Sequence, residues 1–253
     1  MLAGGDVNVV VRIGNTVRRP VGAWSPAVHA LLRHFEAAGF HGAPRFLGID
    51  DEGREILSFV HGEAAVAPVP GGDDVLFEIG SLLRRMHDAQ ASFGCADAGW
   101  QRSVGAPESG EVVCHNDLFW PNLIFRAGMP VALIDWDLAA PAPRVHDLAS
   151  AARFWAPLRP DDQAEAWGLP IDRRRERLLA LCDGYELEPR ERPAVLDAAG
   201  ELGRNWIDTY RSWGRDLRLP GWSEIWDRDG DRFLLATQRW LEEHRAEVAR
   251  WLR

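Results

Sequence analysis

Residues 112–125 read VVCHNDLFWPNLIF, and residues 131–137, a few positions later, read VALIDWD. Short runs of β-branched and apolar residues flank the polar positions, and such runs are typical of buried β-strands. The side chains of His115, Asp117, Asn122 and Asp135 are therefore expected in tight loops at strand ends. One such residue alone usually caps or supports a turn. Four of them at this spacing indicate a catalytic function.

The spacing His-x-Asp-x-x-x-x-Asn, followed by an Asp on the next strand, is the catalytic layout of protein-kinase-like phosphotransferases. A carboxylate at Asp117 can accept the proton of an acceptor hydroxyl or orient that hydroxyl. The amide oxygen of Asn122 and the carboxylate of Asp135 are hard oxygen ligands that suit Mg²⁺. His115 completes the catalytic set, and we expect it to brace the loop through hydrogen bonds rather than transfer protons. The sequence thus predicts catalysis by Asp117 and Mg²⁺ binding by Asn122 and Asp135.

With these residues in view, the chain resembles the aminoglycoside phosphotransferase family, within the group that also includes choline kinases. His115-Asn116-Asp117 and Ile134-Asp135-Trp136 stand where protein kinases have His-Arg-Asp and Asp-Phe-Gly. Asp147-Leu148-Ala149 matches the family's Asp-Leu-Ala, which implies that Asp147 supports the catalytic loop through backbone hydrogen bonds. Read without the family, Asp147 could equally cap the apolar run that follows it. The resemblance covers nearly the whole chain, and it implies that ATP and Mg²⁺ are the cofactors.

The fold class predicted from this resemblance is α+β, a protein-kinase-like fold of two lobes. We expect residues 1–61 to form an N-terminal nucleotide-binding lobe, with a small antiparallel sheet and one main helix. Residues 62–253 are expected to form a C-terminal catalytic and substrate-binding lobe that is mainly helical. Apolar residues at three- and four-residue spacing predict helices in this second part. Segregation of the strands from the helices is what an α+β fold requires.

The chain contains no lysine, although kinase-fold enzymes place a Lys on the third strand to grip the α- and β-phosphates of the nucleotide. The matching segment reads as a hairpin that turns at Gly14-Asn15. Its second strand carries Arg18 and Arg19, the cations at the place where Lys is expected. Adjacent strand residues point to opposite faces, so only one of the two can face the nucleotide. We favour Arg18, and the alternative is an exposed basic pair at a strand end.

A second departure concerns the helix predicted to begin at Ser25-Pro26. In the resembling enzymes a Glu in the first half of this helix pairs with the strand Lys. Here this helix contains no acid before Glu36, and Val28 and His29 occupy the region instead. Either another group replaces the ion pair, or the helix lies elsewhere in the sequence.

Two backbone features complete the predicted nucleotide site. Residues 4–8, GGDVN, resemble the family's glycine-rich first hairpin, where a backbone without side chains can approach phosphates. A hairpin that turns near Asp50–Gly53 leads into the segment expected to join the lobes. By resemblance, the carbonyl of Ser58 and the amide of Val60 pair with adenine. A plain strand that ends at Gly62 is the alternative.

Composition narrows the class of protein and of partner. The 29 basic and 38 acidic residues give a net charge of −9, which argues against nucleic acid as a partner, since its phosphates require a basic surface. No apolar run approaches the roughly 20 residues that cross a bilayer, so we expect no membrane partner. Three cysteines without metal-ligand spacing favour reduced thiols and a cytoplasmic location.

The acceptor is expected to be a small hydroxylated molecule, cationic in the manner of an aminoglycoside. Six tryptophans follow residue 205 with acids interleaved, and Glu224, Asp227 and Asp229 form the most substrate-like patch. Tryptophans at helical spacing are mostly core residues, however, and acids before a helix are common. Two other functions stay open: a catalytically silent kinase-fold protein that binds a nucleotide or metabolite, and a metal-dependent hydrolase built on Asp117, Asp135 and Asp137. No histidine cluster accompanies the acids, which disfavours the hydrolase.

Overall fold

Two hairpins form the first sheet of the computed structural model, which describes residues 10–65, 72–94 and 99–253. Its antiparallel strands follow the order β1-β2-β4-β3. They are β1 (Val11–Ile13), β2 (Thr16–Arg19), β3 (Phe46–Ile49) and β4 (Glu55–Ser58). Gly14 and Gly53 have positive φ angles in the two connecting turns, as the hairpin predictions require. The glycine-rich segment at residues 4–8 lies outside the described residues.

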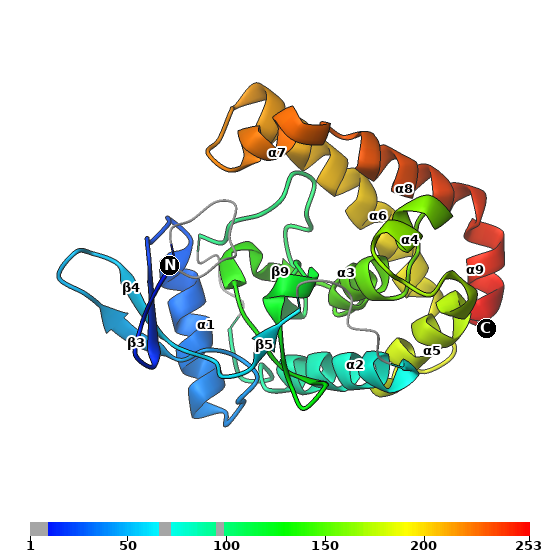
Figure 1. Cartoon of the computed structure of the whole chain (residues 1–253). Helices are drawn as coiled ribbons and strands as arrows, with labels where there is room; N and C mark the ends of the chain where they lie inside the picture. Colours follow the sequence, from blue (N-terminus) through cyan, green and yellow to red (C-terminus); the bar gives the residue numbers. More distant parts are fainter. Residues whose placement is uncertain (1–9, 66–71, 95–98) are drawn as a thin grey trace.

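Helix α1 (Ser25–Ala37) covers one face of this sheet (Figure 1). Its apolar positions recur at helical spacing and are buried, among them Val28, Leu31, Leu32 and Phe35. The helix thus begins at Ser25-Pro26, where the sequence predicted it, so the missing Glu is not explained by a misplaced helix.

Two further small sheets carry the motif residues. One has the order β5-β7-β8, and the other pairs β6 with β9. Their strands are β5 (Glu63–Ala64), β6 (Val112–Cys114), β7 (Leu123–Arg126), β8 (Met129–Leu133) and β9 (Ala140–Ala142). Because β5 pairs with β7, the chain has left the first sheet by residue 63. The lobe boundary at residues 61 and 62 remains a prediction.

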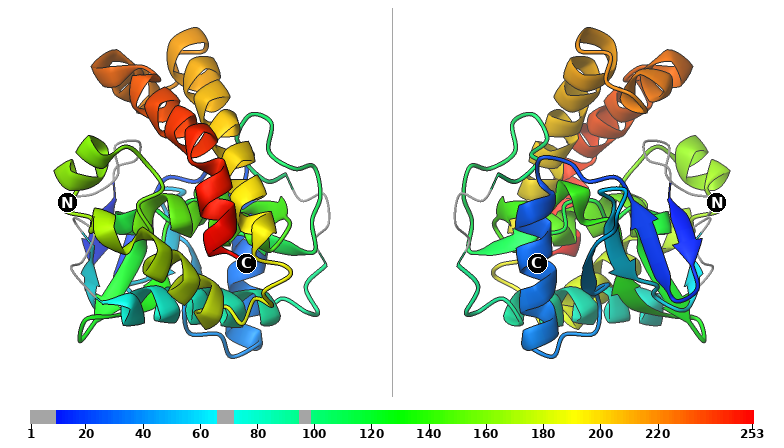
Figure 2. Two further views of the ribbon diagram at one scale, coloured as in Figure 1. Left: turned by 90° about the vertical axis from the view of Figure 1, so that its right-hand side faces the viewer. Right: turned by 90° about the vertical axis from the view of Figure 1, so that its left-hand side faces the viewer.

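The rest of the described chain is mainly helical, as predicted. The helices are α2 (Asp73–Asp88), α3 (Val145–Trp155), α4 (Asp161–Ala166), α5 (Arg174–Gly184), α6 (Pro193–Thr209), α7 (Trp222–Asp229), α8 (Arg232–Glu243) and α9 (Arg245–Trp251), with short 3₁₀ segments at Trp120–Asn122, Trp136–Leu138 and Ile171–Arg173 and a π-helical segment at Tyr210–Asp216. Figure 2 shows that α6 and α8 cross and then diverge toward α7. None of the helices in the described ranges is both long and apolar enough to cross a membrane.

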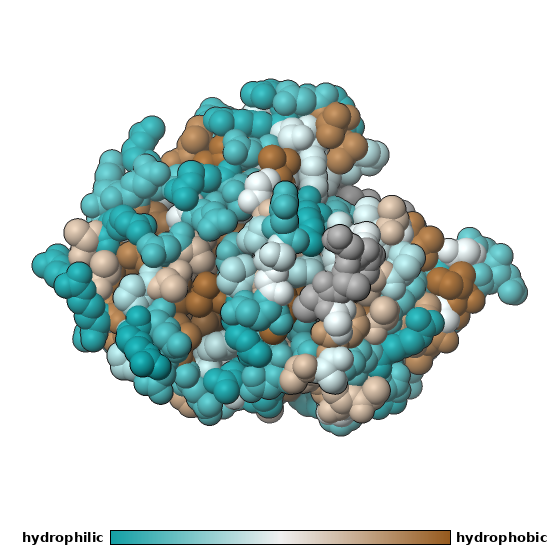
Figure 3. Space-filling view, turned by 180° about the vertical axis from the view of Figure 1, so that it is seen from behind, coloured by the Kyte–Doolittle hydropathy of each residue, from teal (hydrophilic) through white to brown (hydrophobic). Residues whose placement is uncertain are grey.

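One large apolar core runs from α1 through the motif strands into the helices, and Phe35, Leu83, Trp136 and Trp155 are almost completely buried in it. The face opposite to that of Figure 1 is largely hydrophilic, with separate hydrophobic patches (Figure 3). Because the strands and helices pack around one continuous core, they hold fixed positions relative to one another. The ends of the loops between the motif strands are therefore fixed as well.

Candidate active site

Asp117 and Asn122 lie next to each other in the loop between β6 and β7. The side-chain nitrogen of Asn122 donates to Oδ2 of Asp117 at 2.8 Å and to the Asp117 carbonyl at 3.1 Å. This use of the nitrogen leaves the amide oxygen of Asn122 as the atom that can ligate a cation. Burial raises the pKa of Asp117 to about 6, although the nearby His115 acts to lower it. Asp117 can therefore accept a proton near neutral pH.

Asp135 follows β8 and lies on the loop that faces Asp117. Its backbone is left-handed, with φ 62°, and 47% of its side chain is exposed. Two hydrogen bonds tie this loop to the Asp117 loop: the Ile134 amide donates to the Asn122 carbonyl at 2.9 Å, and Nε2 of His115 contacts the Ile134 carbonyl at 2.9 Å. His115 is fully buried, so its position suits bracing. The structure thus brings together Asp117, Asn122 and Asp135, the three oxygen-bearing residues of the motif.

Asp147, at the start of α3, lies directly under the catalytic loop. Its two carboxylate oxygens accept the amides of His115 at 2.9 Å and Asn116 at 2.8 Å. Burial would raise the pKa of Asp147, but the hydrogen bond and charge of His87 and the other contacts hold it below its ordinary value. The charged carboxylate is therefore stable there, and it fixes the backbone on which Asp117 is mounted.

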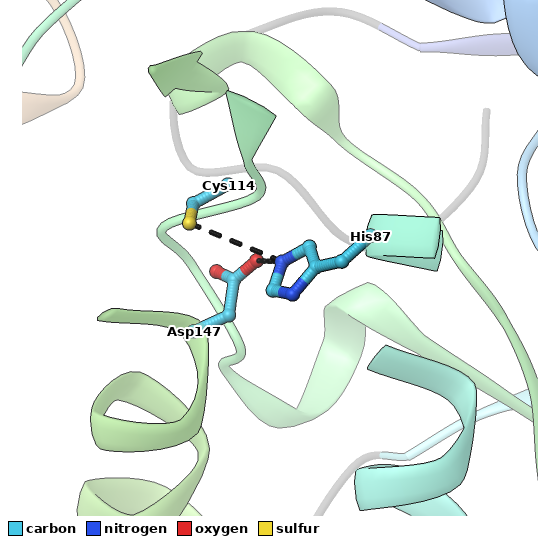
Figure 4. A group of neighbouring side chains, drawn as sticks. All are labelled: His87, Cys114 and Asp147. Carbon is cyan, nitrogen blue, oxygen red and sulfur yellow. Dashed lines mark hydrogen bonds and ion pairs between the residues drawn. The ribbon is translucent and has the colours of Figure 1, made fainter. Parts of the chain in front are cut away.

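His87, Cys114 and Asp147 form a fully buried group at this anchor (Figure 4). Nε2 of His87 lies 3.0 Å from Asp147, and Nδ1 lies 2.8 Å from the Tyr185 hydroxyl. Within the described ranges, this is the one group of three potential metal ligands whose donor atoms all lie within 4.8 Å of one another. Because the Asp147 oxygens already accept hydrogen bonds from backbone and His87, we assign the group to anchoring rather than to metal binding. The three acids of the hydrolase alternative form no such group in the part of the chain that is described.

Arg19, and not Arg18, faces the motif carboxylates, so the preference for Arg18 is wrong. Nη1 of Arg19 donates to Asp135 at 2.8 Å, and Nη2 donates to Asp137 at 2.6 Å. Arg18 points to the other face of β2, where it donates to Thr16 at 2.7 Å and lies 3.5 Å from Asp50. Burial would lower the pKa of Arg19, but the charges of Asp137 and Asp135 outweigh it and raise that pKa.

Glu55 is the buried acid that contacts Arg19 from within the sheet. It lies on β4 opposite Arg19 of β2, and Nε of Arg19 donates to it. Nε2 of His29, on α1, lies 2.5 Å from the other oxygen of Glu55. The sequence analysis did not identify Glu55 or the partner of His29. The sequence did carry a signal for Glu55: the alternation of side chains along β4 places this acid on the buried face of the sheet, where an acid needs a partner.

Ser58 is the last residue of β4, and Val60 lies in the segment that follows; these are the residues predicted to contact adenine. The amides of Ser58 and Phe59 are used by the sheet, since they donate to Arg45 at 2.9 Å and Asn15 at 2.8 Å. A cavity of about 240 Å³ opens beside this segment, but its walls come from α1, the chain that follows it, residues 58–61 and Arg126. It does not include Asp117 or Asp135, so it is separate from the motif site.

The predicted substrate patch lies on α7, at the outer end of the α6–α8 pair (Figure 1). Asp227 makes a bidentate ion pair with Arg218, at 2.6 and 2.7 Å, and Asp229 lies 3.9 Å from Arg232. Glu224 accepts a hydrogen bond from Ser223 at 3.0 Å. The structure does not bring these acids into contact with the motif residues that it describes.

Comparison with known proteins gives consistent results. Residues 96–181, which include the whole catalytic motif, match the model of the phosphotransferase enzyme family. A trifolitoxin immunity protein from Rhizobium leguminosarum bv. trifolii is 40% identical over 202 residues, which are 78% of this chain and 77% of that protein.

Solved structures of kinases share the fold. A choline/ethanolamine kinase family protein from Mesorhizobium loti superposes with a TM-score of 0.56 at 17% identity, over 98% of this chain and 89% of that one. An amicoumacin kinase in complex with AMP-PNP, Ca²⁺ and Ami superposes with a TM-score of 0.59 at 12% identity, over 93% of this chain and 89% of that one. At these identities the likeness shows the protein-kinase-like fold alone. Together with the motif and the related immunity protein, it places this chain in the phosphotransferase enzyme family.

Proposed function

We propose that this protein transfers the γ-phosphate of ATP to a hydroxyl group of a small acceptor molecule. The observation that carries the proposal is the convergence of Asp117, Asn122 and Asp135 from two hydrogen-bonded loops. The donor set fits a divalent cation, because the amide oxygen of Asn122 and the half-exposed carboxylate of Asp135 are the hard ligands that Mg²⁺ takes. When bound, Mg²⁺ and ATP supply the phosphoryl group and the positive charge that offsets its oxygens.

The residues of the chain have separable roles in this proposal. Asp117 orients the acceptor hydroxyl and takes its proton, for which a pKa of about 6 is well suited near neutral pH. Asn122 and Asp135 hold the cation. Arg19 supplies the positive charge for the nucleotide phosphates that a Lys supplies elsewhere, and its planar fork can bind two oxygens at once. The carbonyl of Ser58, the last residue of β4, and the amide of Val60 recognise adenine.

For the acceptor we propose a small hydroxylated molecule of the antibiotic or toxin type, and aminoglycosides are among the molecules to test. The name of the related immunity protein supports a toxin as the acceptor, because phosphorylation adds charge and would alter such a molecule. A cationic acceptor would have to compete with arginines for Asp227 and Asp229, whose carboxylates already face Arg218 and Arg232. This favours an acceptor screen that is not restricted to polycations.

A catalytically silent binding protein is the second candidate, and one observation favours it. The guanidinium of Arg19 lies 2.8 Å from Asp135, where a cation ligand is needed. In an enzyme, Mg²⁺ must share or replace this contact. In a silent protein, Arg19 would hold Asp135 permanently.

Two measurements separate these functions. The thermal midpoint is first recorded with ATP, with Mg²⁺ and with both, for the wild type and for Asp135→Asn. A stabilisation by ATP that requires Mg²⁺ and is lost in the variant is expected for the enzyme. Phosphate transfer is then measured against aminoglycosides, macrolides, choline and sugars. If the nucleotide binds equally well with and without Mg²⁺ and no acceptor is phosphorylated, the protein is a catalytically silent binding protein instead.

A further inference from the structure

Arg19 and Glu55 are cross-strand partners in the first sheet. The register of the β2–β4 pair places them directly opposite each other, and Nε of Arg19 donates to Oε1 of Glu55. Glu55 is 1% exposed and Arg19 is 7% exposed. Because ladder hydrogen bonds fix the two backbones, the sheet holds the carboxylate opposite Arg19.

His29 attaches α1 to this pair. Its Nε2 lies 2.5 Å from Oε2 of Glu55, so each oxygen of the carboxylate faces a different partner. The His29 ring stacks on Phe46 of β3, with ring centroids 3.7 Å apart and planes inclined by 20°. The stacked ring has little freedom to rotate, and Glu55 is therefore clamped between a strand residue and a helix residue.

Each nitrogen of the Arg19 guanidinium points at a different carboxylate. Nε faces Glu55, whereas Nη1 and Nη2 face Asp135 and Asp137 at the motif site. An ammonium group has no fixed fork and cannot keep this division of contacts. The buried end of the guanidinium is thus anchored to the sheet, and the two terminal nitrogens are presented toward the site.

We propose that Glu55 and His29 are positioning residues for nucleotide phosphates: Glu55 orients Arg19, and His29 acts through Glu55. This inference rests on the proposed function, since it assigns the same site a phosphate-binding cation. Nε stays on Glu55 and Nη2 stays on Asp137, while Nη1 becomes available to phosphate oxygens once a divalent cation occupies the Asp135 carboxylate. The contact that elsewhere joins a strand Lys to a helix Glu is here made within the sheet, between Arg19 of β2 and Glu55 of β4, and His29 connects α1 to it.

The test compares ATP with adenosine, both titrated by calorimetry in the presence of Mg²⁺. Glu55→Gln keeps the size of the side chain but removes its charge, so it should weaken ATP binding about tenfold or more, since charge-assisted hydrogen bonds are the strong ones. Adenosine binding should stay within about twofold, because adenosine carries no phosphate for Arg19 to grip. Glu52→Gln, an exposed substitution in the β3–β4 turn of the same hairpin, is the matched control and should leave both affinities unchanged.

His29 provides the second arm of the experiment. His29→Phe keeps an aromatic ring on Phe46 but loses the contact with Glu55, and should weaken ATP binding several-fold, whereas His29→Gln keeps a donor and should recover most of it. In the Glu55→Gln background, His29→Phe should cause no further loss, because His29 acts through Glu55. Circular dichroism spectra and unfolding midpoints identify any variant that fails to fold.

The outcomes separate the two levels of the proposal. A wild-type protein that binds no ATP overturns the proposed function and this inference together. A wild type that binds ATP while Glu55→Gln and both His29 variants bind it equally well overturns the inference alone. Equal losses for ATP and adenosine also overturn it, since they would show a general disturbance of the fold.

Discussion

The side-chain nitrogen of Asn122 lies 2.8 Å from Oδ2 of Asp117, so the proposed cation ligand also holds the proposed base. This bond favours the ionised form of Asp117, yet burial has the larger effect and raises the pKa of that carboxyl to about 6. An acid whose pKa is raised by folding lowers the free energy of unfolding at neutral pH, because the acid is charged there. The proposed base, Asp117, therefore lowers the stability of the folded protein at the pH at which it would act.

Asp117→Asn should abolish turnover and stabilise the fold. Loss of a general base lowers kcat by about 10²–10⁴-fold. Removal of the half-buried charge should raise the free energy of unfolding at pH 7 by about 1–3 kcal/mol, since two pKa units correspond to roughly 3 kcal/mol. Initial rates and urea unfolding measure the two effects. Asp51→Asn, at an exposed position in the β3–β4 turn, is the control and should change neither. Full activity of the Asp117 variant would remove Asp117 from the role of base.

The rate should depend on pH through the same group. With a pKa of about 6 in the folded protein, Asp117 is charged above that pH and becomes protonated below it. We expect kcat/KM for the acceptor to fall about tenfold per pH unit below pH 6, because only the carboxylate can take the proton. The stability cost of Asp117 should fade over the same range as it binds its proton. A rate that stays constant from pH 8 down to pH 5 would contradict this assignment.

Asp147 should be the opposite case, an acid whose charge stabilises the fold. It accepts the amides of His115 and Asn116 and contacts His87, so Asp147→Ala leaves buried donors without partners and should cost about 3 kcal/mol or more. Asp161→Asn, an exposed partner of Arg174, should cost less than about 1 kcal/mol. Chemical denaturation of the purified variants gives both values.

The pH dependence of the free energy of unfolding provides a second test of the stabilising role of Asp147. Its pKa in the folded protein lies below the ordinary value of 3.8, so its contribution is fully present above pH 3.8 and is lost as pH falls through the lowered pKa. The wild type should therefore lose stability more steeply than Asp147→Ala below about pH 4. Parallel curves for the two proteins would show that the charge of Asp147 does not contribute.

Much of the motif site was predictable from the sequence because its residues lie close together along the chain. Asp117 and Asn122 are five residues apart, and both follow strand β6, so local strand ends bring them together whatever the rest of the fold does. The helix at residues 25–37 was predictable for a similar reason, since its apolar spacing and its Pro26 start are local signals. Short sequence patterns thus predict contacts between residues that are close together along the chain.

The contacts around Arg19 could not be predicted in this way. Alternation says that Arg18 and Arg19 face opposite sides of the strand, but it does not say which side faces the site. That choice depends on the neighbour of β2 in the sheet, and Glu55 is 36 residues away in sequence. The contact between His87 and Tyr185 spans 98 residues and depends on the packing of α2 against α5. Strand order and helix packing are global properties, which no short motif contains.

Gly62 should be irreplaceable where the chain leaves the first sheet. Its φ angle is 147°, and a Cβ atom there would lie 2.5 Å from the Phe125 carbonyl oxygen and 2.5 Å from a methyl carbon of Ile124. Gly128 also has a positive φ, 80°, but a Cβ there meets nothing within 4 Å, so Gly128→Ala measures the backbone strain alone, about 1 kcal/mol. Gly62→Ala should cost about 3 kcal/mol or more, because β7 must shift in addition to the strain. Urea unfolding of the two variants tests this, and equal losses would show that the close approach to β7 has no energetic weight.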